Sequence, residues 1–203
     1  MSKPTLFIDM DNVLFDTVDA IKYMYDEDFR LYSDYHEVFL NQLTSYDFSE
    51  LNLLTKKQLT QYFNSGRFFD VVNCIDGAEL SLCTLNGFNK IPIVFVSIGT
   101  PENLKGKKLW INQYNENYQT DIKFIGISDK DKSQVDMSGG ILIDDLIQNL
   151  ESSNADMKIC FGDYGWNKDW DGIRVTNWSQ LRKLVFEEVN KRAESEDQTK
   201  SGE

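Results

Sequence analysis

Two pairs of aspartates each follow a short apolar run in the sequence. Asp9 and Asp11 end the run that begins at Leu6, and Asp144 and Asp145 directly follow residues 140–143. In an extended chain, side chains at positions i and i+2 point to the same side, so Asp9 and Asp11 would repel each other unless a cation lies between them or one carboxyl holds a proton. A solvated turn or a helix N-terminus would explain one pair alone, but not why both pairs end apolar runs. Because open α/β sheets bind ligands at the carboxyl ends of their strands, and carboxylate oxygens suit Mg²⁺, we expect one divalent-metal site there.

A hydroxyl and a lysine complete the groups that phosphoryl transfer needs. Ser97 ends the apolar run 94–97, shortly before a helix that Thr100 and Pro101 are expected to begin. Its hydroxyl and the nearby backbone N–H groups could hold phosphate oxygens. Lys132, with Lys130 as the alternative, precedes the second acidic pair and offers positive charge to a transferring group.

The elements that must position these residues are short strands alternating with longer amphipathic segments. Six apolar runs are expected to be strands, at residues 5–10, 91–97, 122–126, 140–143, 157–161 and 172–175. Most of them are nearly continuous in apolar residues, as is typical of parallel strands that are covered on both faces. Helices are expected from Thr100 toward Tyr114 and after Asn177. The pattern predicts an α/β fold with a Rossmann-like parallel sheet flanked by helices.

The stretch between the first and second strands is too long for one crossover. It is polar and rich in aromatic residues, and Val18, Ile21 and Tyr25 lie at helical spacing within it. We interpret residues 16–76 as a small helical cap inserted after the first strand, with a few ordinary core helices as the alternative. The core is then expected at residues 1–15 and 77–191. Residues 192–203 contain no large apolar side chain and are expected to form a disordered tail.

Composition and charge exclude several functions. The 203 residues carry a net charge of −12, which argues against general binding to nucleic acid or to anionic membranes. No signal peptide or membrane-spanning run is visible. Three cysteines without metal spacing are expected to be free thiols, which favours a cytoplasmic location. With one histidine, His36, and no nucleophile-elbow motif, multi-histidine metal sites are excluded and a Ser-His-Asp triad is disfavoured.

Four motifs in order resemble those of the haloacid-dehalogenase superfamily of phosphotransferases. The first, DxDx(V/T), stands at residues 9–13, and the others are Ser97, Lys132 and the pair Asp144-Asp145. Within the superfamily the chain is similar to the 5′(3′)-deoxyribonucleotidases. That finer resemblance rests on DMDxVLxD at the first motif, Gly77-Ala78 before a helix, Lys107-x-x-Trp110, and LIDD at the fourth motif. The chain departs from the usual pattern at three positions: Asn12 replaces a glycine, Leu146 an arginine and Thr17 an aromatic residue.

The resemblance implies a Mg²⁺-dependent phosphatase that acts through an aspartyl-phosphate. Asp9 would be the nucleophile and Asp11 the general acid and base. The metal ligands would be Asp9, the main-chain carbonyl of Asp11 and Asp145, with Asp144 helping through water. The phosphoryl group would be held by Ser97, Lys132 and Lys107.

The expected substrate is a deoxyribonucleoside monophosphate. Thr17, Phe48, Phe68 and Phe69 are candidates for the surface that contacts it. Two alternatives stay open: a phosphatase for another small ester, such as a sugar phosphate or a nucleic-acid end, and a non-catalytic binding protein on the same fold. The resemblance is also compatible with a homodimer.

Overall fold

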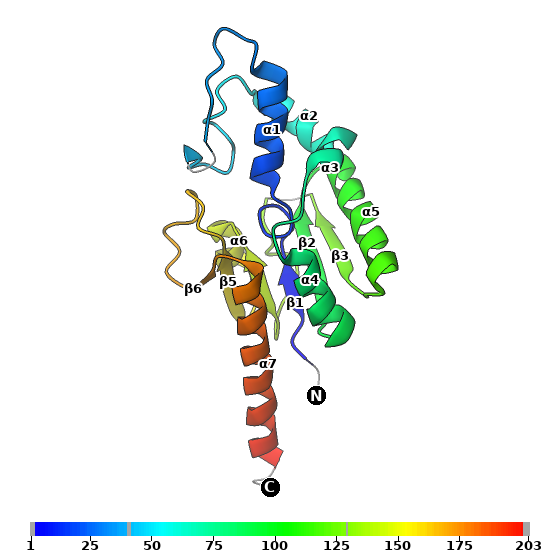
Figure 1. Ribbon diagram of the computed structural model, residues 1–203. Coiled ribbons are helices and arrows are strands. Elements are labelled where there is room, and N and C mark those ends of the chain that lie inside the picture. The colour runs from blue at the N-terminus through cyan, green and yellow to red at the C-terminus, as the bar shows by residue number, and fades with distance from the viewer. Residues whose placement is uncertain (1–2, 40–41, 129, 201–203) are drawn as a thin grey trace.

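The computed structural model describes residues 3–39, 42–128 and 130–200 of the chain. Within this part of the chain, the strands form one parallel six-stranded sheet in the order β3-β2-β1-β4-β5-β6 (Figure 1). The strands are β1 (Leu6–Ile8), β2 (Ile93–Ile98), β3 (Lys123–Ile127), β4 (Ile141–Asp144), β5 (Met157–Phe161) and β6 (Ile173–Val175). All six correspond to apolar runs expected to be strands, which confirms the predicted α/β fold class.

The register of the central strand sets the place of the aspartates. β1 lies between β2 and β4, and Ile8 pairs with Phe95 on one side and with Ile143 on the other. The backbone N–H of Asp9 donates to the carbonyl oxygen of Ile143 at 2.9 Å. Because the strands are parallel, the residues that follow Ile8 and Ile143 emerge side by side at the carboxyl edge of the sheet.

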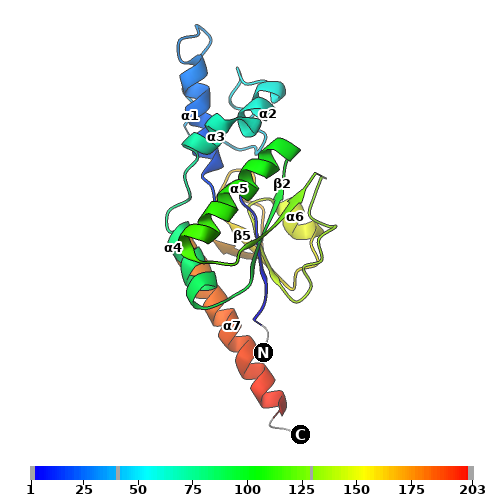
Figure 2. The same cartoon turned by 90° about the vertical axis from the view of Figure 1, so that its right-hand side faces the viewer.

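Helices cover both faces of the sheet (Figures 1 and 2). One face packs against α4 (Ala78–Leu82), α5 (Pro101–Tyr118) and α7 (Trp178–Lys200), and a short π-helical segment, η2 (Cys83–Phe88), follows α4. Trp178 is fully buried in this layer and its indole N–H donates to the carbonyl oxygen of Val13 at 2.8 Å. The other face packs against α6 (Ile147–Ser152) and the segment before β4, where Val135 and Met137 are buried.

Three helices and a long irregular segment stand over the carboxyl edge of the sheet, at the end of the molecule away from the C-terminal end of α7 (Figure 1). They are α1 (Thr17–Phe29), α2 (Lys56–Asn64) and α3 (Gly66–Val71). These helices share an apolar cluster of their own, in which Ile21, Tyr25 and Phe68 are fully buried. The two chain segments that join this layer to the core are hydrogen-bonded to each other. The backbone N–H of Asp16 donates to the carbonyl oxygen of Asn73 at 2.9 Å, and that of Ile75 donates to the carbonyl oxygen of Leu14 at 2.8 Å. We propose that this layer, residues 16–76, is the cap.

The C-terminal segment is a helix where a disordered tail was expected. α7 continues to Lys200, and the structure does not describe residues 201–203. Arg192 donates to Glu188 at 2.7 Å and to the carbonyl oxygen of Gly139 at 2.8 Å, so the helix is still attached to the core there. The expectation was wrong for residues 192–200 because the absence of apolar side chains argues only against packing. Glu, Lys, Arg and Gln remain good helix formers.

No helix in the described part of the chain combines the length and hydropathy that crossing a bilayer requires.

Candidate active site

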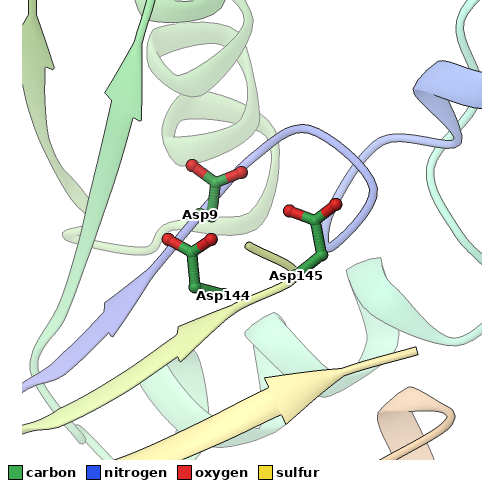
Figure 3. A group of neighbouring side chains, drawn as sticks. All are labelled: Asp9, Asp144 and Asp145. Carbon is green, nitrogen blue, oxygen red and sulfur yellow. The ribbon is translucent and has the colours of Figure 1, made fainter. Parts of the chain in front are cut away.

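Three carboxylates meet where β1 and β4 end. Asp9 follows β1, Asp144 is the last residue of β4 and Asp145 follows it. One oxygen from each lies within 4.8 Å of the others, and all three side chains point away from the sheet in the same direction (Figure 3). All three are buried, with at most 7% of any residue exposed.

Burial raises the pKa of two carboxyl groups in this cluster. Loss of solvent raises the pKa of Asp9 to about 7, the charge of Lys132 opposes that rise, and the neighbouring Asp144 and Asp11 add to it. The pKa of Asp145 is also raised well above its ordinary value, first by burial and then by Asp144 and Asp9. Keeping these buried carboxylates negatively charged therefore costs free energy, and a bound cation would remove that cost.

Lys132 lies between two of these carboxylates. Its ammonium group is fully buried and contacts Asp9 Oδ1 and Asp144 Oδ2, each at 2.5 Å. Burial acts to lower the pKa of Lys132, but the charges of Asp144 and Asp9 outweigh it and raise the pKa above its ordinary value. Lys130, the alternative to Lys132, is exposed instead and contributes to the wall of the adjoining cavity.

Asp144 is saturated by donors from the protein. Besides Lys132, it accepts hydrogen bonds from the backbone N–H of Leu146 at 2.9 Å and from the Asn149 amide at 3.1 and 3.2 Å. With these contacts, Asp144 is better suited to holding Lys132 in place than to binding a ligand directly. The sequence-based prediction of the site did not include Asn149. Its position about one helical turn after the aspartate pair is the signal that could have identified it.

A second buried lysine joins Asp11 to Ser97. Lys107 projects from α5, is fully buried, and donates to a carboxylate oxygen of Asp11 and to Ser97 Oγ, the latter at 2.8 Å. The other oxygen of Asp11 accepts from Thr17 Oγ1 at 3.0 Å. The helix that carries Lys107 begins as expected, with Thr100 accepting from Asn103 N–H and Pro101 at its first turn.

The structure thus brings together seven predicted residues: Asp9, Asp11, Ser97, Lys107, Lys132, Asp144 and Asp145. Two buried lysines offset two of the four carboxylates, and a divalent cation would offset the other two. Clustered carboxylate oxygens are the ligands that Mg²⁺ prefers, so the residues present fit such an ion.

A cavity of about 590 Å³ opens above these groups, between the core and the cap helices. Asp9, Asp11 and Asp145 line its inner end. This volume lies within the roughly 300–1,000 Å³ that small-molecule sites commonly have.

The predicted substrate residues divide into two groups. Thr17 and Phe48 line the cavity. Phe68 and Phe69 do not, which corrects their assignment: Phe68 is fully buried in the cap cluster, and the ring of Phe69 lies over Gly106 of α5. Other aromatic residues, which the sequence did not single out, line the cavity instead: Tyr46, Phe63 and Trp166.

Asn12 also belongs to this site. It has a φ of +55°, in the left-handed region, which explains why a glycine is usual there and why asparagine is tolerated. Its amide nitrogen donates to Asp145 Oδ2 at 3.2 Å, and its amide oxygen accepts from the backbone N–H of Val18 at 3.2 Å. The sequence shows that Asn12 replaces a glycine. It does not show that the Asn12 side chain contacts Asp145, which lies 133 positions away in the chain.

The chain matches known proteins at the level of family and fold. A family model described as 5′ nucleotidase, deoxy (pyrimidine), cytosolic type C protein matches residues 3–193. No curated protein sequence matches the chain significantly. Among solved structures, it is similar to a predicted phosphatase from Clostridium acetobutylicum, with a TM-score of 0.63, 17% identity and coverage of 92% of this chain and 100% of that one. A haloacid dehalogenase-like hydrolase from Streptococcus pneumoniae matches with a TM-score of 0.54, 16% identity and coverage of 89% and 98%.

At these identities the solved structures show the fold alone, and the family is shown by the match over nearly the whole chain. The chain belongs to the cytosolic type C 5′-nucleotidase family and is a phosphatase with the haloacid-dehalogenase fold.

Proposed function

We propose that the chain is a Mg²⁺-dependent 5′(3′)-deoxyribonucleotidase, which hydrolyses deoxyribonucleoside monophosphates to nucleosides and phosphate. The observation that carries the proposal is the cavity itself: Asp9, Asp11 and Asp145 line it together with aromatic side chains from the cap and the core. Two of these aspartates, Asp9 and Asp11, are contacted by the buried Lys132 and Lys107. An anionic phosphate would enter the charged end, and the base would lie against the aromatic walls.

Asp9 is the nucleophile in this proposal. Lys132 holds Oδ1, and among the described side chains none donates to Oδ2, which leaves that oxygen for attack on phosphorus. The new bond joins Asp9 to the phosphoryl group while the bond from phosphorus to the nucleoside oxygen breaks. Lys107 and Ser97, already in contact with each other, would bind the phosphoryl oxygens.

Asp11 handles the proton in both steps. Its carboxyl gives a proton to the departing nucleoside oxygen, and later takes one from the water that attacks the phosphorus of the aspartyl-phosphate. The second step releases inorganic phosphate and restores the Asp9 carboxylate. Thr17 and Lys107 hold the two oxygens of Asp11 beside the cavity before substrate binds.

A divalent ion would be held by Asp9 and Asp145, with the main-chain carbonyl of Asp11 as a further ligand. When bound, it would shield the Asp9 carboxylate from the negative charge of the phosphate. Asp144 contributes by orienting Lys132.

A screen of phosphate release with Mg²⁺ over deoxyribonucleotides, ribonucleotides and sugar phosphates tests the substrate. We expect deoxyribonucleoside monophosphates to give the highest kcat/KM. If glucose 6-phosphate or a similar ester were clearly the best substrate, the nucleotidase assignment would fail while the phosphatase assignment stood.

We further propose that the enzyme acts in the cytoplasm on free nucleotides rather than on nucleic-acid ends, in keeping with the net charge of −12. A homodimer stays a prediction, which light scattering in solution would test.

A further inference from the structure

Asp145 is held through one oxygen by two side chains. Its Oδ2 accepts a hydrogen bond from the Asn12 amide at 3.2 Å and from the Trp166 indole N–H at 3.0 Å. Among the described residues, none donates to Oδ1, and Asp145 lines the cavity. The carboxylate therefore has one oxygen engaged by the protein and one directed to the site.

The two donors support each other through a closed set of contacts. The Trp166 ring stacks on Tyr164, with ring centroids 4.7 Å apart and planes 3° from parallel. The Tyr164 hydroxyl donates to the main-chain oxygen of Asn12 at 2.9 Å. Asn167, in the same loop, donates to the main-chain oxygen of Asp145 at 3.1 Å and is fully buried. The loop after β5 is therefore attached both to the loop after β1 and to the end of β4.

This arrangement bears on which cation the site accepts. Mg²⁺ demands near-octahedral geometry with single oxygens at about 2.0–2.1 Å, whereas Ca²⁺ takes more ligands at about 2.3–2.6 Å and often both oxygens of one carboxylate. Two hydrogen bonds to Oδ2 occupy the oxygen that two-oxygen coordination would need. They also fix the rotamer of Asp145, so that less conformational freedom is lost when an ion binds.

We propose that Asn12 and Trp166 are positioning residues that restrict Asp145 to one-oxygen coordination and so favour Mg²⁺ over Ca²⁺. The inference rests on the proposed metal-dependent function and deepens it. It assigns a role to the asparagine that replaces the usual glycine, and to a tryptophan 21 residues beyond the metal-binding aspartates.

Trp166→Phe is the variant that tests the proposal most cleanly. It removes the indole N–H but keeps a ring that can stack on Tyr164. Trp170→Phe is the matched control, because Trp170 lies in the same loop and its indole N–H donates to the carbonyl oxygen of Ile173 at 3.0 Å, away from Asp145. Asn12→Gly removes the other donor at a φ that glycine adopts freely. It also removes the acceptor for Val18, so its thermal stability must be measured alongside.

The measurement is titration calorimetry of the substrate-free protein with Mg²⁺ and, separately, with Ca²⁺. Loss of one outer partner of a metal ligand typically lowers metal affinity about 10–100-fold, so we expect Trp166→Phe to weaken Mg²⁺ binding at least about tenfold. Ca²⁺ binding should weaken less, which lowers the ratio of the two affinities. Asn12→Gly should lower that ratio as well, and Trp170→Phe should leave both affinities unchanged.

Three results would overturn the proposal, and they can be told apart. Equal Mg²⁺ affinity in Trp166→Phe and the unaltered chain would show that the indole does not position Asp145. Equal losses for both ions would show general damage to the site without any effect on selectivity. No Mg²⁺ binding by the unaltered chain would remove the proposed cofactor itself, and with it this inference.

Discussion

Replacing Lys132 with methionine should cost the protein a large share of its stability. Methionine keeps the length of the side chain and removes its charge, so the Asp9 and Asp144 carboxylates lose the cation that each contacts at 2.5 Å. Removing one partner of a buried ion pair typically costs about 3–5 kcal/mol, because the remaining charge stays buried without compensation. Asp144 keeps its bonds from Asn149 and Leu146, which limits its part of the loss. We therefore expect a decrease in the free energy of unfolding of about 3–5 kcal/mol.

Thermal unfolding followed by circular dichroism in chelator measures this loss without help from a bound ion. For a domain of about this size, 1 kcal/mol shifts Tm by roughly 2–4 °C, so Tm should fall by roughly 6–20 °C. Lys108→Met, on the exposed side of α5, is the matched control. Because Lys108 is exposed, its replacement should change the free energy of unfolding by no more than about 0.5 kcal/mol. Equal Tm values for the two variants would refute the placement of Lys132 between the carboxylates.

The remaining predictions concern the metal, the base and the cap. Phosphate release should stop in EDTA and return with Mg²⁺, whereas Ca²⁺ should restore it poorly; full activity in chelator would contradict the metal assignment. Phe63→Ala should raise KM for a deoxyribonucleotide at least about fivefold, since stacking on a base is worth about 1–3 kcal/mol. The same variant should leave kcat/KM for a sugar phosphate, which has no base, little changed. Equal losses for both substrates would show that the Phe63 ring supports the packing of the cap and does not contact the base. Gly106→Ala should lower Tm, because the added methyl carbon would lie 2.2 Å from the Phe69 ring. Such overpacking costs about 1–3 kcal/mol, against a gain of about 1 kcal/mol from replacing a glycine inside a helix. Gly66→Ala, where nothing lies within 4 Å, should not lower it, and a Gly106→Ala variant as stable as the parent would exclude the tight contact.

The sheet could be predicted from the sequence because each strand is a local signal. A parallel strand covered on both faces needs a short apolar run bounded by polar residues, and all six runs of this kind became strands. The same reasoning brought Asp9 and Asp144 together, since parallel register places the ends of neighbouring strands at one edge. The helix beyond residue 192 could not be predicted in this way, because a segment without large apolar residues can still be helical.

The details of the site depend on contacts that sequence spacing does not contain. In a small cap, an apolar side chain can face the cap's own core or the cavity, so Phe68 and Phe63 were indistinguishable until the helices were packed together. The Trp166 indole reaches Asp145 only because the loop after β5 folds back over the end of β4. Asn12 was recognisable as a departure from glycine, but its hydrogen bond to Asp145 was not.

The most direct test of the central claim is to trap the phosphoryl group on the enzyme. Asp11→Asn removes the group that would activate water for the second step, whereas p-nitrophenyl phosphate has a leaving group that needs little protonation for the first. After incubation of this variant with p-nitrophenyl phosphate and Mg²⁺, rapid acid quenching and peptide mass spectrometry should show one added phosphoryl group on the peptide that contains Asp9. The matched Asp9→Asn variant should show no added phosphate and no turnover. A phosphoryl group on any other residue, or near-normal turnover by Asp9→Asn, would contradict the assignment of Asp9 as the nucleophile.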